Sequence, residues 1–347
     1  MQHEITAQQR LLNAAGNIAE PGFAKKLYWI YDRADIKAPK WRIKEWDYYY
    51  IGCADYGLCL TISDAGFVSS LSASVLTFGE HPTMKNGSAM GWFPLGKLHL
   101  PATSEKGDVA AKVGKADMRF ANDGKIRRLS GSIADYAGSK DTLRFDLTLT
   151  DFPEESMVIA TPFKKKAHFY YNQKINCMRA EGFVTYGYHN RTYEFDPAES
   201  FAVLDWGRGV WTYDNTWYWG SASGLADGVP FGFNIGYGFG DTSAATENML
   251  FYNGRAHKLS HVKFCIPGEE TGSPDYLAPW TFSSDDGRFE MDFVPALDRK
   301  SKTDFKLLMS DQHQVFGRFT GTVVLDDGTP LEIRGLPGFA EKVRNKW

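Results

Sequence analysis

Two-residue turn signals recur along the chain and divide it into short segments. Each is Asn or Asp followed by Gly, a dipeptide that accepts the positive φ angles of tight hairpin turns. The six are Asn86-Gly87, Asp123-Gly124, Asp227-Gly228, Asn253-Gly254, Asp286-Gly287 and Asp327-Gly328. Because hairpin turns join neighbouring antiparallel strands, these signals predict a fold built mainly from antiparallel sheet.

The segments between the turns alternate apolar and polar residues, as half-buried strands do. In the stretch 143–150, every second residue is Leu or Phe, and the residues between them are Arg, Asp and Thr. Similar patterns occur at 57–63, 168–178, 262–266, 288–293 and 314–325. Only residues 4–15 and 339–344 have a spacing that favours helix. The chain is therefore predicted to be all-β with little helix.

Length and an internal echo predict two domains. The 347 residues suffice for two hydrophobic cores. The sequence Leu129-Ser130-Gly131-Ser132-Ile133 resembles Phe319-Thr320-Gly321-Thr322-Val323, which suggests two similar halves. The segment 151–166 contains two prolines and three consecutive lysines and suits a crossover. We therefore predict β domains at residues 1–160 and 161–347. Barrel closure would protect their edge strands and leave room for a small ligand.

Composition argues against several classes of partner. The formal net charge is −3, and basic residues are scattered apart from 164–166, so no nucleic-acid partner is expected. No apolar run approaches the ~20 residues of a membrane helix, and the first residues lack a signal-peptide pattern. We expect a cytoplasmic protein without stable membrane insertion. Its cysteines, Cys53, Cys59, Cys177 and Cys265, form no CxxC pair and are expected to be buried, reduced thiols.

Motifs for a metal, a nucleotide or a serine nucleophile are weak. His257 and His261 would lie ~13 Å apart on an extended strand, too far to share one ion. The glycines of 236–240 have the spacing GxGxG and lead into a strand-like segment, whereas a dinucleotide loop requires a following helix. At 220–224 the central residue of a potential GxSxG motif is alanine. We therefore expect no cofactor and no metal.

The stretch 204–211 sets an acid and a base beside large aromatic rings, and further rings follow at 213, 217 and 219. This density of ring surface and charge predicts a ligand cavity, which the polar residues flanking the glycine-rich segment are expected to reach. The candidate binding residues are Trp206, Arg208, Trp211, Tyr213, Trp217, Trp219, Asn234, Asp241 and Asn248.

The same segments resemble a known family, DUF2804. The resemblance rests on Asp205-Trp206-Gly207-Arg208-Gly209, on the segments 217–224 and 232–241, on Glu247-Asn248, and on shorter matches at 11–22, 44–49, 313–317 and 338–341. It covers nearly the whole chain. The resemblance implies an architecture similar to the calycin-like tandem barrels of tocopherol cyclase and carotenoid hydratase. The expected fold is thus two tandem lipocalin-like antiparallel barrels.

Carboxylates near the rings are the candidate catalytic groups. The residues are Asp47, Asp205 and Glu247. A carboxyl group among aromatic rings loses hydration, which raises its pKa and allows it to act as a general acid. The ring faces could stabilise a developing carbocation by ~1 to 2 kcal/mol each. Alternatively, Asp205 pairs with Arg208 in a buried structural ion pair; it would then be ionised, and Glu247 or Asp47 would be the better acid.

These residues favour an enzyme that performs acid-assisted hydration, cyclisation or elimination on a small hydrophobic, isoprenoid- or lipid-like molecule. Two alternatives use the same residues. A non-catalytic carrier needs the cavity but no protonated acid. A carbohydrate-active enzyme, a glycoside hydrolase or lyase, would stack sugar rings on tryptophans in a groove and bind them with carboxylates and amides. The oligomeric state stays open at this stage.

Overall fold

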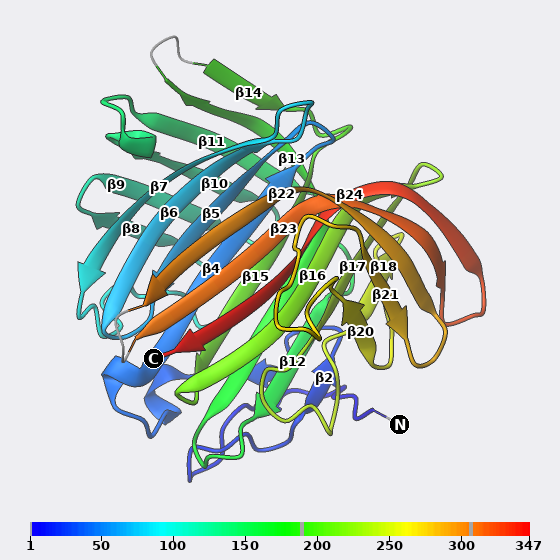
Figure 1. The fold of residues 1–347 in the computed structure, drawn as a ribbon. Coiled ribbons are helices and arrows are strands. Elements are labelled where there is room, and N and C mark those ends of the chain that lie inside the picture. The colour runs from blue at the N-terminus through cyan, green and yellow to red at the C-terminus, as the bar shows by residue number, and fades with distance from the viewer. Residues whose placement is uncertain (1, 188–190, 305–307) are drawn as a thin grey trace.

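The computed structural model describes residues 2–187, 191–304 and 308–347, most of which lie in the strands of two large antiparallel sheets (Figure 1). Within these ranges no α-helix occurs; the helical segments are short 3-10 turns at Arg33–Asp35, Lys40–Arg42 and Tyr136–Gly138. The fold is all-β, which confirms the class predicted from the turn signals and the alternation.

The first sheet has thirteen strands and surrounds a large apolar core. Its main path is, in spatial order, β7 (Thr83–Trp92), β6 (Val68–Thr77), β5 (Tyr56–Asp64), β4 (Ile43–Gly52), β15 (Phe201–Val210), β13 (Phe169–Tyr186), β11 (Leu143–Thr150), β10 (Arg127–Ile133), β9 (Ala116–Asn122) and β8 (Val109–Val113). Strands β12 (Met157–Pro162), β14 (Arg191–Phe195) and β2 (Gly22–Ala24) extend it. The sheet curls until β7 and β8 approach each other, since a Cβ on Gly91 would lie 3.3 Å from Val113. A separate parallel pair joins β1 (Gln9–Arg10) and β3 (Trp29–Ile30).

The second sheet has nine strands and a core rich in phenylalanine. Its order is β19 (Arg255–Lys258), β18 (Met249–Tyr252), β17 (Val229–Tyr237), β16 (Asp214–Ala226), β24 (Pro330–Lys346), β23 (Met309–Val324), β22 (Phe289–Asp304), β21 (Trp280–Ser284) and β20 (Val262–Cys265). The ring centroids of Phe293 and Phe319 lie 4.4 Å apart in this core. The long strands β22, β23 and β24 extend across the face of the first sheet that β4, β5 and β15 form (Figure 1).

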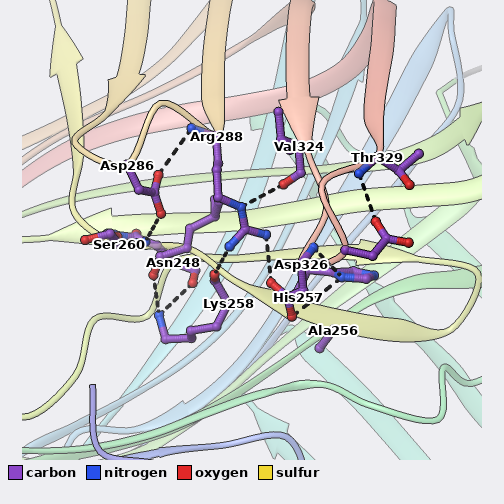
Figure 2. A network of polar contacts seen from close by, with 12 residues as sticks. Asn248, Ala256, His257, Lys258, Ser260, Asp286, Arg288, Val324, Asp326 and Thr329 are labelled. Carbon is purple, nitrogen blue, oxygen red and sulfur yellow. Dashed lines mark hydrogen bonds and ion pairs between the residues drawn. The ribbon is translucent and has the colours of Figure 1, made fainter. Parts of the chain in front are cut away.

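Arg288 connects strands at one end of the second sheet through hydrogen bonds (Figure 2). Its guanidinium donates to the carbonyl oxygens of Val324 at 2.9 Å and Lys258 at 2.8 Å, and to the carboxylate of Asp326 at 2.7 Å. Lys258 in turn donates to the carbonyl oxygen of Asn248 at 2.7 Å. These hydrogen bonds connect edge strand β19 to the end of β23.

Five of the six turn dipeptides lie in turns between neighbouring antiparallel strands, as predicted. They are Asp123-Gly124, Asp227-Gly228, Asn253-Gly254, Asp286-Gly287 and Asp327-Gly328. The prediction for Asn86-Gly87 is wrong, because both residues lie inside strand β7. A Cβ on Gly87 would come within 2.4 Å of the ring of Tyr136, so glycine is needed there to admit that ring.

Neither of the two predicted helices forms. Residues 339–344 belong to β24, a central strand with β16 on one side and β23 on the other. Phe339 packs against the ring of Tyr50 in the first sheet, whereas Ala340 lies in the core of the second. Because residues 338–341 of β24 are buried on both faces, apolar residues do not alternate there. In the segment 4–15, Ile5, Leu11 and Leu12 are anchored in the first core without forming a helix.

The change from one sheet to the other lies at residues 211–213, after β15 and before β16. The predicted boundary near residue 160 falls within β12, which pairs with β13 inside the first sheet. The proline-containing segment thus leads from one strand of the first sheet to the next. The division into two domains stays a prediction.

Three of the cysteines, Cys53, Cys59 and Cys177, are buried free thiols, as predicted. The prediction is wrong for Cys265, which is exposed. It lies on strand β20 at the edge of the second sheet, where alternate side chains face outward.

A β-bulge in β13 joins the two sheets. The pairing of β13 with β15 shifts register between Ile175 and Met178, and Cys177 has a φ of 63°. The bulge turns Asn176 toward the second sheet, where its Nδ2 lies 2.8 Å from Ser221 Oγ and 3.1 Å from the carbonyl oxygen of Phe233. Asn176 is completely buried. One side chain of the first sheet therefore satisfies acceptors in β16 and β17.

Replacing Asn176 with Ala is expected to lower the free energy of unfolding by ~1 to 3 kcal/mol, because buried acceptors lose their donor. Chemical denaturation measures this change. Gln8→Ala, at an exposed position, is the control and is expected to leave the unfolding midpoint unchanged. An equal, negligible effect of both substitutions would show that Asn176 does not link the sheets energetically.

Candidate functional site

A cavity of about 330 Å³ lies between the two sheets. Strands β4, β5, β6, β13 and β15 of the first sheet line one side, and β16, β22, β23 and β24 of the second line the other. Five residues outside the strands complete the lining: Ala65, Trp211, Phe239, Glu247 and Trp347. Its volume falls within the range of small-molecule sites, and its lining combines many rings with a few polar groups.

Polar side chains form a row across the first sheet. The residues are in register from strand to strand and all line the cavity: Lys174, Asp205, Tyr48, Thr61 and Ser72. The Lys174 Nζ lies 2.9 Å from Oδ1 of Asp205, and the Asn172 Nδ2 donates to the same oxygen at 2.6 Å. The carboxylate of Asp205 is thus held by one cation and one amide.

A second row faces it from the other sheet. It consists of Trp219, Glu341, Gln314 and Arg299, which are in register on β16, β24, β23 and β22. The Arg299 Nη1 donates to Oε1 of Gln314 at 3.0 Å, and the Tyr48 hydroxyl donates to the same oxygen at 3.3 Å. Gln314 therefore connects the two rows.

Glu341 is the candidate acid in this cavity. Burial raises the pKa of Glu341 to about 7, although the hydrogen bond from Trp217 and the charge of Lys174 act in the opposite direction. The indole Nε1 of Trp217 donates to Oε1 of Glu341 at 3.0 Å. A protonated form of Glu341 is consequently available at neutral pH, as a general acid requires.

Glu247 is a second buried carboxyl group at the cavity. Burial raises its pKa; Lys174 lowers it, and Asp205 raises it further. Asn234 donates through Nδ2 to the main-chain oxygen of Glu247 at 2.8 Å and accepts from the Trp219 indole at 2.7 Å. Asn234 thus fixes the loop that carries Glu247 to an aromatic ring of the cavity.

Contacting aromatic rings form a wall of the cavity. The ring centroid of Trp211 lies 5.0 Å from Phe239, 5.3 Å from Trp46 and 5.9 Å from Trp217. A Cβ on Gly207 would come within 1.9 Å of the Trp46 ring, so this glycine makes room for the tryptophan. Each of these three rings packs edge-on against Trp211, an arrangement that aromatic pairs favour.

The structure brings part of the predicted site together. Asp205, Glu247, Trp211, Trp217 and Trp219 all line the cavity. Their catalytic and binding roles stay predictions.

Four other predicted residues lie away from the lining. Asn234 is buried directly behind it. Asn248 is also buried and donates to the carbonyl oxygen of Ser260 at 2.8 Å (Figure 2). Tyr213 and Asp241 are exposed.

Asp205 and Arg208 are both buried, as expected, and Arg208 donates to the carbonyl oxygen of Gly207, but the alternative of an ion pair between the two is wrong. Successive side chains of a strand point to opposite faces of the sheet. Two residues three positions apart on β15 therefore lie on opposite faces. Asp205 faces the cavity, whereas Trp206 and Arg208 face the core of the first sheet. There the Arg208 Nη1 lies 3.1 Å from Oδ1 of Asp47. The three residues Asp47, Trp206 and Arg208 are therefore outside the cavity.

Sequence reasoning missed Lys174, Glu341, Gln314 and Arg299. The alternation of 168–178 placed Lys174 on a strand, but nothing local indicated that it faces Asp205. Glu341 lies in a segment predicted to be helical, which concealed its alignment with Gln314. The match of 338–341 to the family pattern was the signal that could have drawn attention to Glu341.

Comparisons with known proteins agree with this architecture. Residues 2–347 match the model of DUF2804, described as a domain of unknown function. The chain belongs to the DUF2804 family. Kievitone hydratase from Nectria haematococca has a similar structure, with a TM-score of 0.52, 14% identity and 98% coverage of both chains. This likeness confirms the predicted hydratase-like architecture; at such low identity it shows the fold alone.

Another structure similar to this DUF2804 protein is assigned as AttH from Nitrosomonas europaea. Its TM-score is 0.47 at 12% identity, with 87% of this chain and 92% of that chain covered. A search of curated proteins finds no sequence match.

Two further observations concern the described part of the chain. No helix there is long and apolar enough to cross a membrane. Nor do three or more His, Cys, Asp or Glu side chains gather there in a group that could hold a metal ion.

Replacing Arg208 with Ala is expected to lower the free energy of unfolding by ~3 kcal/mol or more, because Asp47 would be left buried without its cation. The measurement is denaturant-induced unfolding. Arg128→Ala removes an exposed arginine that pairs with Asp146, and it is the matched control. Arg128→Ala should barely move the midpoint. Similar small shifts in both variants would contradict the proposed importance of the buried pair.

Proposed function

We propose that this DUF2804 protein binds a small hydrophobic, isoprenoid- or lipid-like molecule between its sheets and catalyses acid-assisted hydration, cyclisation or elimination. The observation that carries the proposal is the buried Glu341 carboxyl group, which faces the cavity beside Trp217 and Trp219 with a pKa of about 7. The similar structure of kievitone hydratase supports the view that a fold of this type can house a hydratase.

Binding would use the aromatic wall. An apolar chain that packs against Trp211, Trp217 and Phe239 leaves water, and this transfer stabilises the complex by roughly 25 cal/mol per Å² of buried apolar surface. Glu341 lies beside two of the cavity's tryptophans, because it is in register with Trp219 and accepts a hydrogen bond from Trp217. A carbon chain bound along these rings would therefore lie beside the acid.

The first chemical step would transfer a proton from Glu341 to one carbon of a C=C bond. The π electrons form the new C–H bond, and the neighbouring carbon becomes cationic while Glu341 becomes a carboxylate. The faces of Trp217 and Trp219 carry negative quadrupole density and would stabilise this cation. Where the bound ligand displaces water from the rings, the same interaction is stronger.

The fate of the cation would determine the reaction. A water molecule that attacks it gives hydration, with the surplus proton passing to Asp205 or Glu247. Attack by another double bond or a hydroxyl of the same ligand gives cyclisation. In the reverse direction, Asp205 or Glu247 in its protonated form gives a proton to a hydroxyl group and water leaves. The Glu341 carboxylate then removes the proton from the adjacent carbon. The contact with Lys174 holds Asp205 in place for these steps.

Deuterium incorporation tests the proton transfer without knowledge of the final product. Isoprenoid alcohols and polyenes are incubated with the protein in D₂O, and their masses are measured. Glu341→Gln is expected to abolish incorporation but to retain quenching of tryptophan fluorescence by the ligand, because the amide keeps the shape and loses the titratable proton. Glu290→Gln, at an exposed position of β22, is the matched control with unchanged incorporation.

Three outcomes would redirect the proposal. Incorporation that survives Glu341→Gln but is lost in Glu247→Gln would transfer the acid role to Glu247. Tight binding without exchange for any ligand would favour the carrier. Binding confined to oligosaccharides would overturn the hydrophobic-ligand hypothesis.

The pH dependence follows from the same carboxyl group. Since Glu341 must be protonated, the exchange rate is expected to be highest below pH 7 and to fall as the pH rises through about 7, the pKa of Glu341. Well above that pH the decline approaches about tenfold per pH unit. A rate that rises through this range would exclude Glu341 as the acid.

A further inference from the structure

The side chain of Lys44 brings an amine to the cavity. It lies on β4, lines the cavity, and is only 3% exposed to solvent. Its Nζ lies 3.6 Å from the ring centroid of Trp347, 5.3 Å from Phe67 and 5.4 Å from Trp211. Three aromatic rings therefore surround the amine at this end of the cavity.

The polar partners that usually hold a buried lysine do not occur here. Among the described residues, no carboxylate forms an ion pair with Lys44 and no oxygen accepts a hydrogen bond from its Nζ. By contrast, the buried Lys174 pairs with Asp205 at 2.9 Å, and Lys258 donates to the carbonyl oxygen of Asn248 at 2.7 Å. Both of those lysines have partners that fix them structurally, whereas Lys44 has only ring faces.

Burial favours the uncharged amine, whereas the ring faces attract the ammonium form. Burial, together with the positive charge of Arg42, lowers the pKa of Lys44 to about 7. A substantial fraction of Lys44 therefore has a free lone pair at neutral pH. Desolvated lysines of this kind are the nucleophiles that form Schiff bases with carbonyl compounds.

We propose that Lys44 forms a reversible Schiff base with an aldehyde or ketone group of the ligand, which makes the ligand a hydrophobic carbonyl compound. This inference deepens the proposed function, because it concerns the same cavity. The Lys44 nitrogen attacks the carbonyl carbon and gives a carbinolamine. Proton transfer from nitrogen to oxygen and loss of one water molecule then give the imine. Hydrolysis by water reverses these steps without any oxidant or reductant.

The position of Lys44 sets the expected shape of the ligand. Lys44 and Tyr48 lie four residues apart on one strand, a distance of ~13 Å between their Cα atoms. Tyr48 belongs to the polar row opposite Glu341. A ligand held at Lys44 would thus extend along the aromatic wall toward Glu341. An extended isoprenoid aldehyde could react with Lys44 through its carbonyl group and place a remote double bond beside Glu341.

Citral, an isoprenoid aldehyde, provides a direct probe. The intact protein is incubated with citral and sodium cyanoborohydride, which reduces an imine to a stable secondary amine, and the modified lysines are located by peptide mass spectrometry. Labelling of Lys44 is expected to exceed that of the average exposed lysine about tenfold or more, because binding holds the reactants together. Geraniol, an alcohol of similar carbon chain, should compete and suppress labelling at Lys44 alone.

A variant and a binding assay separate the possible results. Lys44→Arg keeps the positive charge among the rings but cannot form an imine, so the folded variant should lose the cavity adduct and keep its surface adducts. Citral that quenches tryptophan fluorescence but labels only exposed lysines would overturn the Schiff base and leave the proposed function standing. The absence of both quenching and Lys44 labelling, with geraniol also failing to bind, would overturn both.

Discussion

Strand β15 separates the apolar core of the first sheet from the cavity, and the site depends on which of its side chains point to each side. The strand is buried along its whole length. Its even-numbered residues Trp206 and Arg208 face the core, whereas Asp205 faces the second sheet. Gly207 and Gly209 carry no side chain on the cavity face, which leaves room for Trp46 and Trp211. The alternation of side chains along β15 thus places a carboxylate on the cavity face and leaves space there for two tryptophan rings.

Charges on the two faces of β15 are stabilised differently. On the core face, Arg208 contacts Asp47 and several main-chain oxygens, so its charge is neutralised and its donors are largely satisfied. On the cavity face, Lys174 neutralises Asp205. Glu341 accepts only an indole hydrogen bond from Trp217 and has no ion-pair partner among the described residues. Unpaired and buried, it holds its proton to higher pH than an exposed glutamate does.

The interface between the sheets is both structural and chemical. Asn176 at the bulge of β13 and the rings of Tyr50, Phe316 and Phe339 hold the sheets together beside the cavity. The cavity lining comes from nine strands of both sheets, so no single hairpin could form it. A site built on paired strands is held more precisely than one on mobile loops, which suits a reaction that requires an acid and ring faces in fixed positions.

The sequence alone determined the fold class and the location of the ring-rich segment, because hairpin turns and alternation are local properties. It also placed Asp205, Glu247, Trp211, Trp217 and Trp219 among the candidates, since rings beside acids are visible along the chain. Tertiary structure decided the partners: Asp205 meets Lys174 across a strand pair, and Arg208 meets Asp47 on the opposite face. It also decided that β24 is a strand, which brings Glu341 beside Trp219 and Gln314. Such contacts depend on register between strands distant in sequence, and local periodicity carries no information about that register.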